Sequence, residues 1–296
     1  MTHTEVFERH RSLLFTIAYE IVGTAADAQD AVQDAYLSWS TADLQQVRDH
    51  RAYLARITTR RALDLLRKQT RRREEYVGPW LPEPVATPTG VDGDLAGPVS
   101  MAMLIVLQTL GPIERAVFVL REVFGFPHEE IADIVGKSSD NVRQIARRAR
   151  SHVDARRPRF EADPQRATAV ALDFLAAVQA GDLAGVVRLL APEVVAISDS
   201  GGLVSAARRP VHGADRVARF LAGLFAKGSR RNEIELEVTS CNGLPSVLVT
   251  EDGERSLLVL TEVVDGKVSA LYLVRNPEKL ARVGRTPPLS GPHDFG

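Results

Sequence analysis

The residues best suited to chemistry in this sequence lie between Asn141 and Arg150, where amide and guanidinium side chains gather on one side of a predicted helix. The polar positions are Asn141, Arg143, Gln144, Arg147, Arg148 and Arg150. The opposite side carries aliphatic residues at helical spacing, namely Val142, Ile145, Ala146, Ala149 and Val153. Asparagine, glutamine and arginine can form paired hydrogen bonds with base edges in the major groove, and further arginines neutralise phosphates. The pattern therefore predicts a surface that reads double-stranded DNA.

A second predicted helix precedes this one and makes the pair a helix-turn-helix, within a stretch from about Leu110 to Val153. Residues 127–135 have helical spacing, Gly136 can end that helix, and Ser138 or Ser139 can cap the next. In a helix-turn-helix the second helix enters the major groove. A solvated basic helix in an ordinary bundle is the alternative explanation of the motif taken alone.

The charges of the chain are unevenly distributed, although its formal net charge is only −1. Residues 48–73 contain ten lysines and arginines against Asp49 and Asp64, and residues 143–159 form a second basic segment. Residues 27–34 are acidic and contain no basic residue. Two separated basic faces are typical of contact with a long polyanion, whereas an acidic helix favours a protein partner.

Composition places the chain among globular proteins. Its 296 residues suffice for two or three domains, and 45% of them are hydrophobic and 25% charged. No apolar run has the length of a membrane span, and the N-terminal residues lack the layout of a signal peptide, so we expect a cytoplasmic protein. The single cysteine, Cys241, excludes an internal disulfide and a cysteine-cluster metal site, and we expect it to be a small buried hydrophobe.

The first part of the chain is predicted to be entirely helical, with helices over residues 7–21, 25–39 and 51–68. A stretch rich in proline, glycine, threonine and aspartate follows, and it contains an apolar island around Trp80 and Leu81 that we expect to dock on a folded surface. Helices resume at about Met101 and run to about Ala155. The predicted domains are residues 1–73, a linker over 74–100, the helix-turn-helix domain over 101–160, a third domain over 165–282 and a disordered tail over 283–296.

The third domain has a different pattern, with helices first and strands afterwards. Helices are predicted over residues 166–180, 183–190 and 214–224, and strands over 194–198, 233–240, 246–251, 256–264 and 267–274. Turn dipeptides follow three of the strands: Asn242-Gly243, Asp252-Gly253 and Asp265-Gly266. This order predicts an α+β domain.

The first two domains resemble the extracytoplasmic-function sigma factors of bacterial RNA polymerase. Residues 23–37 look like the helix with which these factors bind the clamp of the polymerase β′ subunit, which implies a role for Asp27, Asp30, Gln33 and Asp34. Residues 51–67 look like the region that opens and reads the −10 promoter element, which implies DNA contacts by Arg56, Arg60, Arg61 and Arg67. The helix-turn-helix corresponds to the −35 reader. One departure concerns the −10 helix, where the family commonly has an asparagine and this chain has Thr59, Arg60 and Arg61.

The third domain resembles the SnoaL-like or NTF2-like cone, and the whole arrangement resembles the sigma-factor group that carries such a cone at its C-terminus, the sigma factor J type. The resemblance rests on residues 80–84 (WLPEP), 210–213 (PVHG) and 276–280 (NPEKL), and on the segment 199–203 (DSGGL), which lacks the lysine that the group often has there. It implies an interdomain regulatory role for Trp80, Leu81, Asp199, Asn276, Pro277 and Lys279. The expected fold is thus multidomain, with two all-α sigma domains, region 2 and region 4, followed by an α+β cone.

The resemblance implies an alternative sigma factor that binds core polymerase and directs initiation at −10/−35 promoters, with its activity modulated in cis by the cone. We expect no separate anti-sigma protein, no cofactor, no metal and no enzymatic activity, because Asp199 and His212 are the only acid–histidine pair that suggests catalysis. The alternative is a one-component helix-turn-helix regulator with a ligand-binding cone and no contact with the polymerase.

Overall fold

A computed structural model of the chain describes residues 2–87, 100–156, 163–228 and 233–283. The chain divides into two compact units, and each is described by itself here. One unit, called the helical unit, comprises Met1–Glu75 and Gly90–Pro158. The other, called the cone unit, comprises Tyr76–Thr89 and Arg159–Gly296. The predicted tail over residues 283–296 lies outside the described residues from position 284 onward.

The first half of the helical unit is formed by three helices, α1 (His3–Val22), α2 (Ala25–Ser40) and α3 (His50–Glu74). Helix α1 ends at Gly23, whose φ of 81° belongs to the left-handed region, and Thr24 caps α2 by accepting a hydrogen bond from the backbone N–H of Asp27. The predicted helix over residues 51–68 continues to Glu74 because residues 69–74 contain no glycine or proline and include good helix formers.

The second half of the helical unit contains the helix-turn-helix. Its helices are α4 (Met101–Leu107), α5 (Pro112–Phe118), the π-helix η1 (Val119–Val123), α6 (His128–Val135) and α7 (Ser139–Asp154). Gly136 ends α6 with a φ of 67°, and the Ser138 side chain caps α7 by accepting from the backbone N–H of Asn141. The predicted aliphatic stripe of α7 is confirmed as its buried face.

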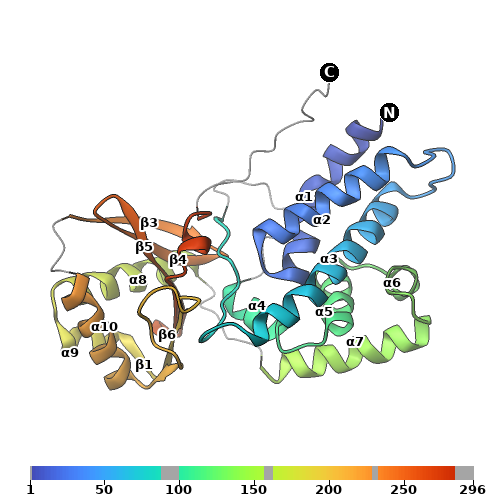
Figure 1. Cartoon of the computed structure of the whole chain (residues 1–296). Coiled ribbons are helices and arrows are strands. Elements are labelled where there is room, and N and C mark those ends of the chain that lie inside the picture. The colour runs from blue at the N-terminus through green and yellow to red at the C-terminus, as the bar shows by residue number, and fades with distance from the viewer. Residues whose placement is uncertain (1, 88–99, 157–162, 229–232, 284–296) are drawn as a thin grey trace. The chain divides into compact units, whose positions relative to one another are not determined.

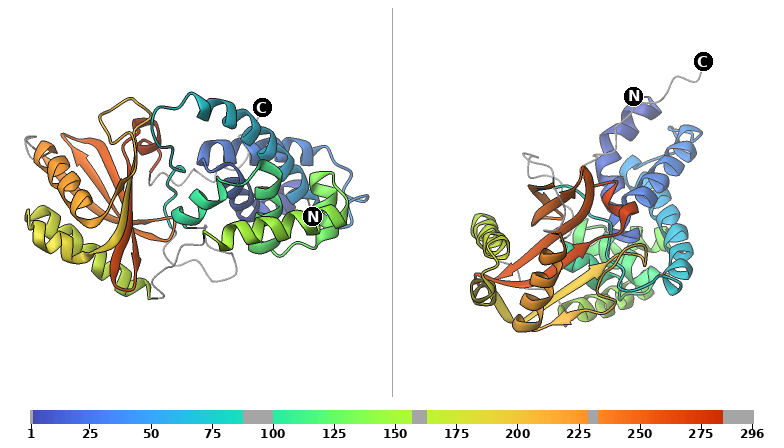
Figure 2. Two further views of the ribbon diagram at one scale, coloured as in Figure 1. Left: turned by 90° about the horizontal axis from the view of Figure 1, so that it is seen from below. Right: turned by 60° about the vertical axis from the view of Figure 1, so that its left-hand side comes forward.

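The cone unit is a six-stranded sheet with helices against one face (Figures 1 and 2). The strands are β1 (Leu190–Asp199), β2 (Val211–His212), β3 (Ile234–Cys241), β4 (Leu244–Glu251), β5 (Glu254–Val264) and β6 (Lys267–Val274), in the order β2-β1-β6-β5-β4-β3. The helices are α8 (Pro164–Gln179), α9 (Leu183–Leu189), α10 (Ala214–Gly228) and the short α11 (Pro277–Leu280).

The core of the cone unit lies between the sheet and helices α8, α9 and α10. Phe174, Val186 and Val217 from the three helices pack there against Val194 of β1 and Leu271 of β6, and all five are buried. The three predicted turn dipeptides each connect two antiparallel strands, with positive φ at both residues of every pair, as two-residue hairpin turns require. The expected fold class, helical domains followed by an α+β domain, is confirmed.

Two short elements of the cone unit have no counterpart in the sequence-based prediction. Strand β2 spans only Val211–His212, and α11 spans only Pro277–Leu280, so neither is long enough to show a periodic pattern. In the described part of the chain, no helix is long and apolar enough to cross a membrane.

Candidate nucleic-acid interface and linker junction

Helix α7 presents its predicted DNA-reading side chains to solvent. Asn141, Arg143, Gln144, Arg147, Arg148 and Arg150 are all exposed. Serine capping at Ser138 fixes the start of the helix, and the buried aliphatic stripe fixes its rotation, so these side chains share the outward face.

Two arginines of this outward face are already paired with carboxylates of the same unit. Arg143 lies 2.8 Å from Glu129 and 2.9 Å from Asp140, and Arg150 binds both oxygens of Glu122 at 2.6 Å. Hydrogen bonds from the Glu129 backbone N–H, from Ser139 and from Arg143 hold the pKa of Glu129 below its usual value. These exposed pairs keep the guanidinium groups oriented without burying them, so a stronger anionic partner can replace the carboxylates.

Helix α3 carries the four arginines predicted for the −10 element, and the structure separates them into two groups. Arg61 and Arg67 are exposed, and Arg67 pairs with Asp64 at 2.9 Å. Arg56 is half-buried, with its guanidinium 4.9 Å from the centre of the Tyr53 ring. Arg60 is hydrogen-bonded to the end of α6, in the same compact unit.

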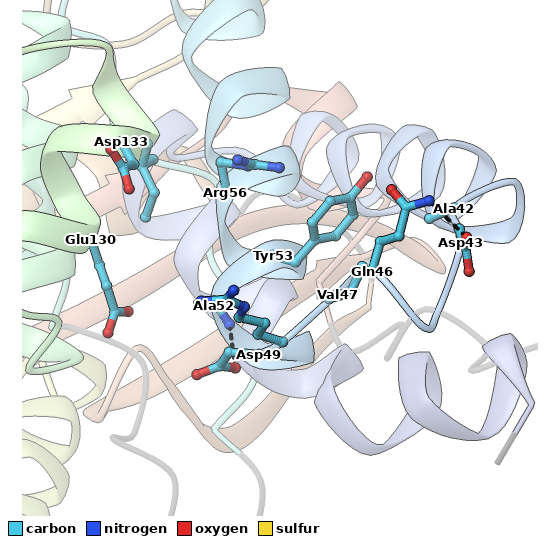
Figure 3. A pocket seen from close by; sticks show the side chains of 12 residues that line it. Ala42, Asp43, Gln46, Val47, Asp49, Ala52, Tyr53, Arg56, Glu130 and Asp133 are labelled. Atoms are coloured by element: carbon cyan, nitrogen blue, oxygen red, sulfur yellow. Dashed lines mark hydrogen bonds between the residues drawn. The ribbon is translucent and has the colours of Figure 1, made fainter.

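A pocket of about 560 Å³ lies beside Arg56, between α3, the α2–α3 connection and α6. Figure 3 shows Tyr53 and Arg56 on one side of it and the carboxylates Glu130 and Asp133 of α6 on the other. The pocket therefore combines residues from both halves of the helical unit.

Helix α2 presents Asp30, Gln33 and Asp34 on an exposed face, as the resemblance implied. Leu37 extends the same face and is 60% exposed, which the sequence-based prediction missed. Its position seven residues after Asp30 and three after Asp34 is the signal that could have found it.

Asp27 of α2 differs from the three exposed residues because it is half-buried. Its carboxylate accepts hydrogen bonds from Thr24 at 2.5 Å and from Gln69 of α3. Asp27 thus joins α2 to α3, a structural role that the sequence-based prediction did not include.

Within the cone unit, the linker residues Tyr76–Thr89 dock around Asp199, at the end of β1. The Asp199 side chain is fully buried and accepts hydrogen bonds from the Tyr76 hydroxyl at 2.5 Å, the Leu81 N–H at 2.7 Å and Lys279 Nζ at 2.6 Å. Burial and the hydrogen bond with Asp199 raise the pKa of Tyr76. We call Tyr76, Trp80, Leu81, Asp199, Asn276 and Lys279 the linker junction.

Lys279 contributes to the linker junction through its charge and its position. Its Nζ donates to the Leu81 carbonyl at 2.5 Å and lies 4.1 Å from the centre of the Trp80 ring, a cation–π contact. Asn276 donates to the Tyr76 hydroxyl at 2.8 Å and caps α11, in which Pro277 occupies the first turn and Lys279 follows. The six residues predicted to be regulatory therefore lie at one place, and Tyr76 is a seventh that the sequence-based prediction missed.

Two glycines allow the linker to approach the cone this closely. A Cβ at Gly201 would lie 2.9 Å from Asn276 Nδ2, and a Cβ at Gly202 would lie 2.9 Å from Val77 Cβ. Both residues also have positive φ, 62° and 77°. The glycine pair after Asp199 is thus required both by its backbone conformation and by the space that the linker occupies.

A second contact joins the linker to the edge of the sheet. Val85 and Asn242 exchange hydrogen bonds, Thr87 N–H donates to the Ser240 carbonyl at 2.9 Å, and Ala86 pairs with Cys241 in antiparallel fashion. Cys241 is buried as predicted, and its burial raises the pKa of its thiol to about 11. Among the described residues, no cluster of histidine, cysteine and acidic side chains could hold a metal ion.

The acid–histidine pair considered for catalysis is not assembled. Asp199 is occupied by the linker, whereas His212 is exposed on β2 and lies opposite Val195, four residues before Asp199 on β1. The junction is a binding arrangement rather than a catalytic one.

Comparison with known proteins agrees with this geometry. The family model of sigma-70 region 2 matches residues 6–72, and that of sigma-70 region 4 matches residues 101–153. The class defined by the fold and by these matches is that of the sigma-70 initiation factors, here with an α+β domain after region 4.

Relatives of the whole chain narrow the class. The chain is 38% identical over 286 residues to the ECF RNA polymerase sigma factor SigJ of Mycobacterium tuberculosis, covering 92% of this chain and 91% of that protein. It is 30% identical to the probable ECF RNA polymerase sigma factor SigI of the same species, with 92% of each chain covered. A crystal structure of M. tuberculosis SigJ matches with a TM-score of 0.75 at 34% identity, over 94% of this chain and 98% of that one.

The chain therefore belongs to the extracytoplasmic-function RNA polymerase sigma factors. It is a transcription initiation factor rather than an enzyme, and its partners are core RNA polymerase and promoter DNA. The one-component regulator is set aside, because that alternative has no polymerase-binding region and region 2 is present here.

Proposed function

We propose that the cone unit regulates this sigma factor in cis through the linker that joins regions 2 and 4. The observation that carries the proposal is the linker junction, in which Asp199 and Lys279 of the cone bind Tyr76 and Leu81 of the linker with buried polar contacts. A linker fixed along its length at residues 76–87 has much less freedom than a flexible chain, and this restricts the separations that regions 2 and 4 can adopt.

The same proposal assigns surfaces to partners. The exposed face of α2, with Asp30, Gln33 and Asp34, binds the clamp of the β′ subunit, and α7 reads the −35 element while α3 binds the −10 element. The cone replaces a separate anti-sigma protein, because it is linked covalently to the linker that it binds.

The test is reconstituted transcription with purified core enzyme and no other protein factor. Full-length chain, a truncation after about residue 161 and the point variants Asp199→Asn and Lys279→Met are compared on one promoter. Lys267→Met is the matched control, since Lys267 is an exposed lysine of the β5–β6 hairpin outside the junction. We expect the truncation and both junction variants to change promoter output and the control to leave it unaltered. Equal output from all five proteins would refute the regulatory role.

A further inference from the structure

Arg60 of α3 binds the C-terminal end of α6, the first helix of the helix-turn-helix. Its Nε donates to the Ile134 carbonyl at 3.1 Å and its Nη2 to the Asp133 carbonyl at 2.8 Å. These carbonyls belong to the last turn of α6, where carbonyl groups have no partner within the helix and carry partial negative charge. The guanidinium is therefore a cationic cap supplied by the other half of the unit.

Two further arginine contacts join the same halves. Arg51, at the start of α3, donates to the Phe124 carbonyl at 3.3 Å, and its guanidinium lies 4.5 Å from the centre of the Phe126 ring. Arg115 of α5 is 1% exposed and donates to the Glu20 carbonyl of α1 at 2.8 Å. The halves thus meet through guanidinium groups and backbone carbonyls, which desolvate little apolar surface and can separate without leaving a large hydrophobic face.

The pocket between these contacts is hostile to a nucleic acid strand. Glu130 and Asp133 of α6 face the half-buried Arg56 across it, as Figure 3 shows. A phosphate entering from solvent would meet these two carboxylates beside the arginine that is expected to attract it.

Promoter geometry requires that this contact break. The −10 and −35 elements lie about 25 base pairs apart, or roughly 85 Å of duplex at about 3.4 Å per base pair. A compact unit of this size has a diameter of roughly 40 Å, so its α3 and α7 cannot occupy both elements while Arg60 caps α6.

We infer that α3 and α6 form an internal clasp that covers the −10 surface of the free factor, with Arg60 as its exchangeable element. The guanidinium caps α6 in the closed state and is released to bind promoter DNA in the open state. The inference rests on the proposed assignment of α3 to the −10 element, and it identifies a residue that couples the two promoter-binding regions directly.

The clasp is tested by a distance measurement that needs no DNA. Spin labels are placed at Glu8→Cys and Ser151→Cys, exposed positions on α1 and α7, in a full-length Cys241→Ser chain. Double electron–electron resonance then gives the distance between the two halves of the helical unit. We expect one short, narrow distribution for the free factor, and a shift of tens of ångströms to longer distance on adding core polymerase and promoter DNA.

The decisive variant is Arg60→Ala, with Lys68→Ala as the control because Lys68 is an exposed cation on the same helix. Arg60→Ala should broaden and lengthen the distribution of the free factor, and Lys68→Ala should not. A free wild-type factor that is already extended, or an Arg60→Ala distribution equal to that of the wild type, would overturn the clasp. Failure of the α3 assignment is seen separately, as unchanged promoter binding by Arg61→Ala and Arg67→Ala despite a closed distribution.

Discussion

Lys279 Nζ lies 2.6 Å from Asp199 Oδ2, and the two side chains are 9% and 0% exposed. A buried ion pair is costly to break from one side, because the remaining charge stays in a low-dielectric site. Here the remaining charge would also lose its position against the linker, since both residues bind Leu81.

Lys279→Met is therefore expected to destabilise the cone by about 3 kcal/mol, the usual range for removing one partner of a buried pair. Urea unfolding, followed by circular dichroism, measures this change. The exposed Lys267→Met serves as control and should shift the midpoint little. If the two variants unfold at the same urea concentration, the Asp199–Lys279 pair does not hold the linker.

Cys241 is the single cysteine of the chain and reports on linker docking. Because its thiol pKa is raised to about 11 and the thiolate is the reactive form, its reaction with a disulfide reagent should be slow and increase about tenfold per pH unit from pH 7 to 9. Leu81→Ala should accelerate this reaction by freeing the linker from the sheet edge, since Leu81 is 1% exposed. Leu203→Ala, at a 60% exposed position, should leave the rate unaltered. A fast reaction in the wild type would contradict the docked linker.

Gly202→Ala and Gly253→Ala form a matched pair, because the two glycines have φ values of 77° and 79°. Both substitutions incur the left-handed penalty of about 1–2 kcal/mol, but only at Gly202 would the new Cβ meet the linker, 2.9 Å from Val77. Gly202→Ala should therefore increase the Cys241 reaction rate and Gly253→Ala should not. Equal rates would mean that Gly202 is required for its backbone conformation alone.

Arg143→Ala is expected to relax −35 selectivity, because Arg143 lies near the start of α7 on its exposed face. A bidentate base contact contributes about 1–3 kcal/mol of discrimination, so the preference for the wild-type element should fall by about tenfold or more. Run-off transcription on wild-type and mutated −35 sites measures the preference. Arg156→Ala, beyond the end of α7, should weaken both templates alike or not at all. An unchanged preference in Arg143→Ala would reject this assignment.

Substitutions on α2 should separate polymerase binding from folding. Asp34→Ala and Leu37→Ala change exposed side chains and should reduce affinity for core enzyme without changing the melting temperature. Asp27→Ala should instead lower stability by about 1 kcal/mol, because Asp27 accepts hydrogen bonds from Thr24 and Gln69. Pull-down with core polymerase and thermal melting distinguish these outcomes. Loss of core binding in Asp27→Ala at unchanged melting temperature would reverse the roles.

Periodicity in the sequence predicted most elements of this fold, because a helix or strand that buries one face must repeat its apolar residues. The stripe from Val142 to Val153 fixed the rotation of α7, and the Asp-Gly and Asn-Gly pairs fixed the hairpins. Strand β2 and helix α11 escaped prediction, since two and four residues are too few for a period.

The sequence by itself determined the family, the helical and α+β parts, and the motifs around Trp80, Asp199 and Lys279. Only the tertiary structure decided which atoms of these motifs meet, because residues about 80 to 200 positions apart come together by packing and not by spacing. The same holds for Asp27 and Arg60, whose types suggest a partner outside the chain. Folding gives Asp27 a contact with Gln69 and Arg60 a contact with α6, since each side chain reaches a polar group that local sequence does not reveal.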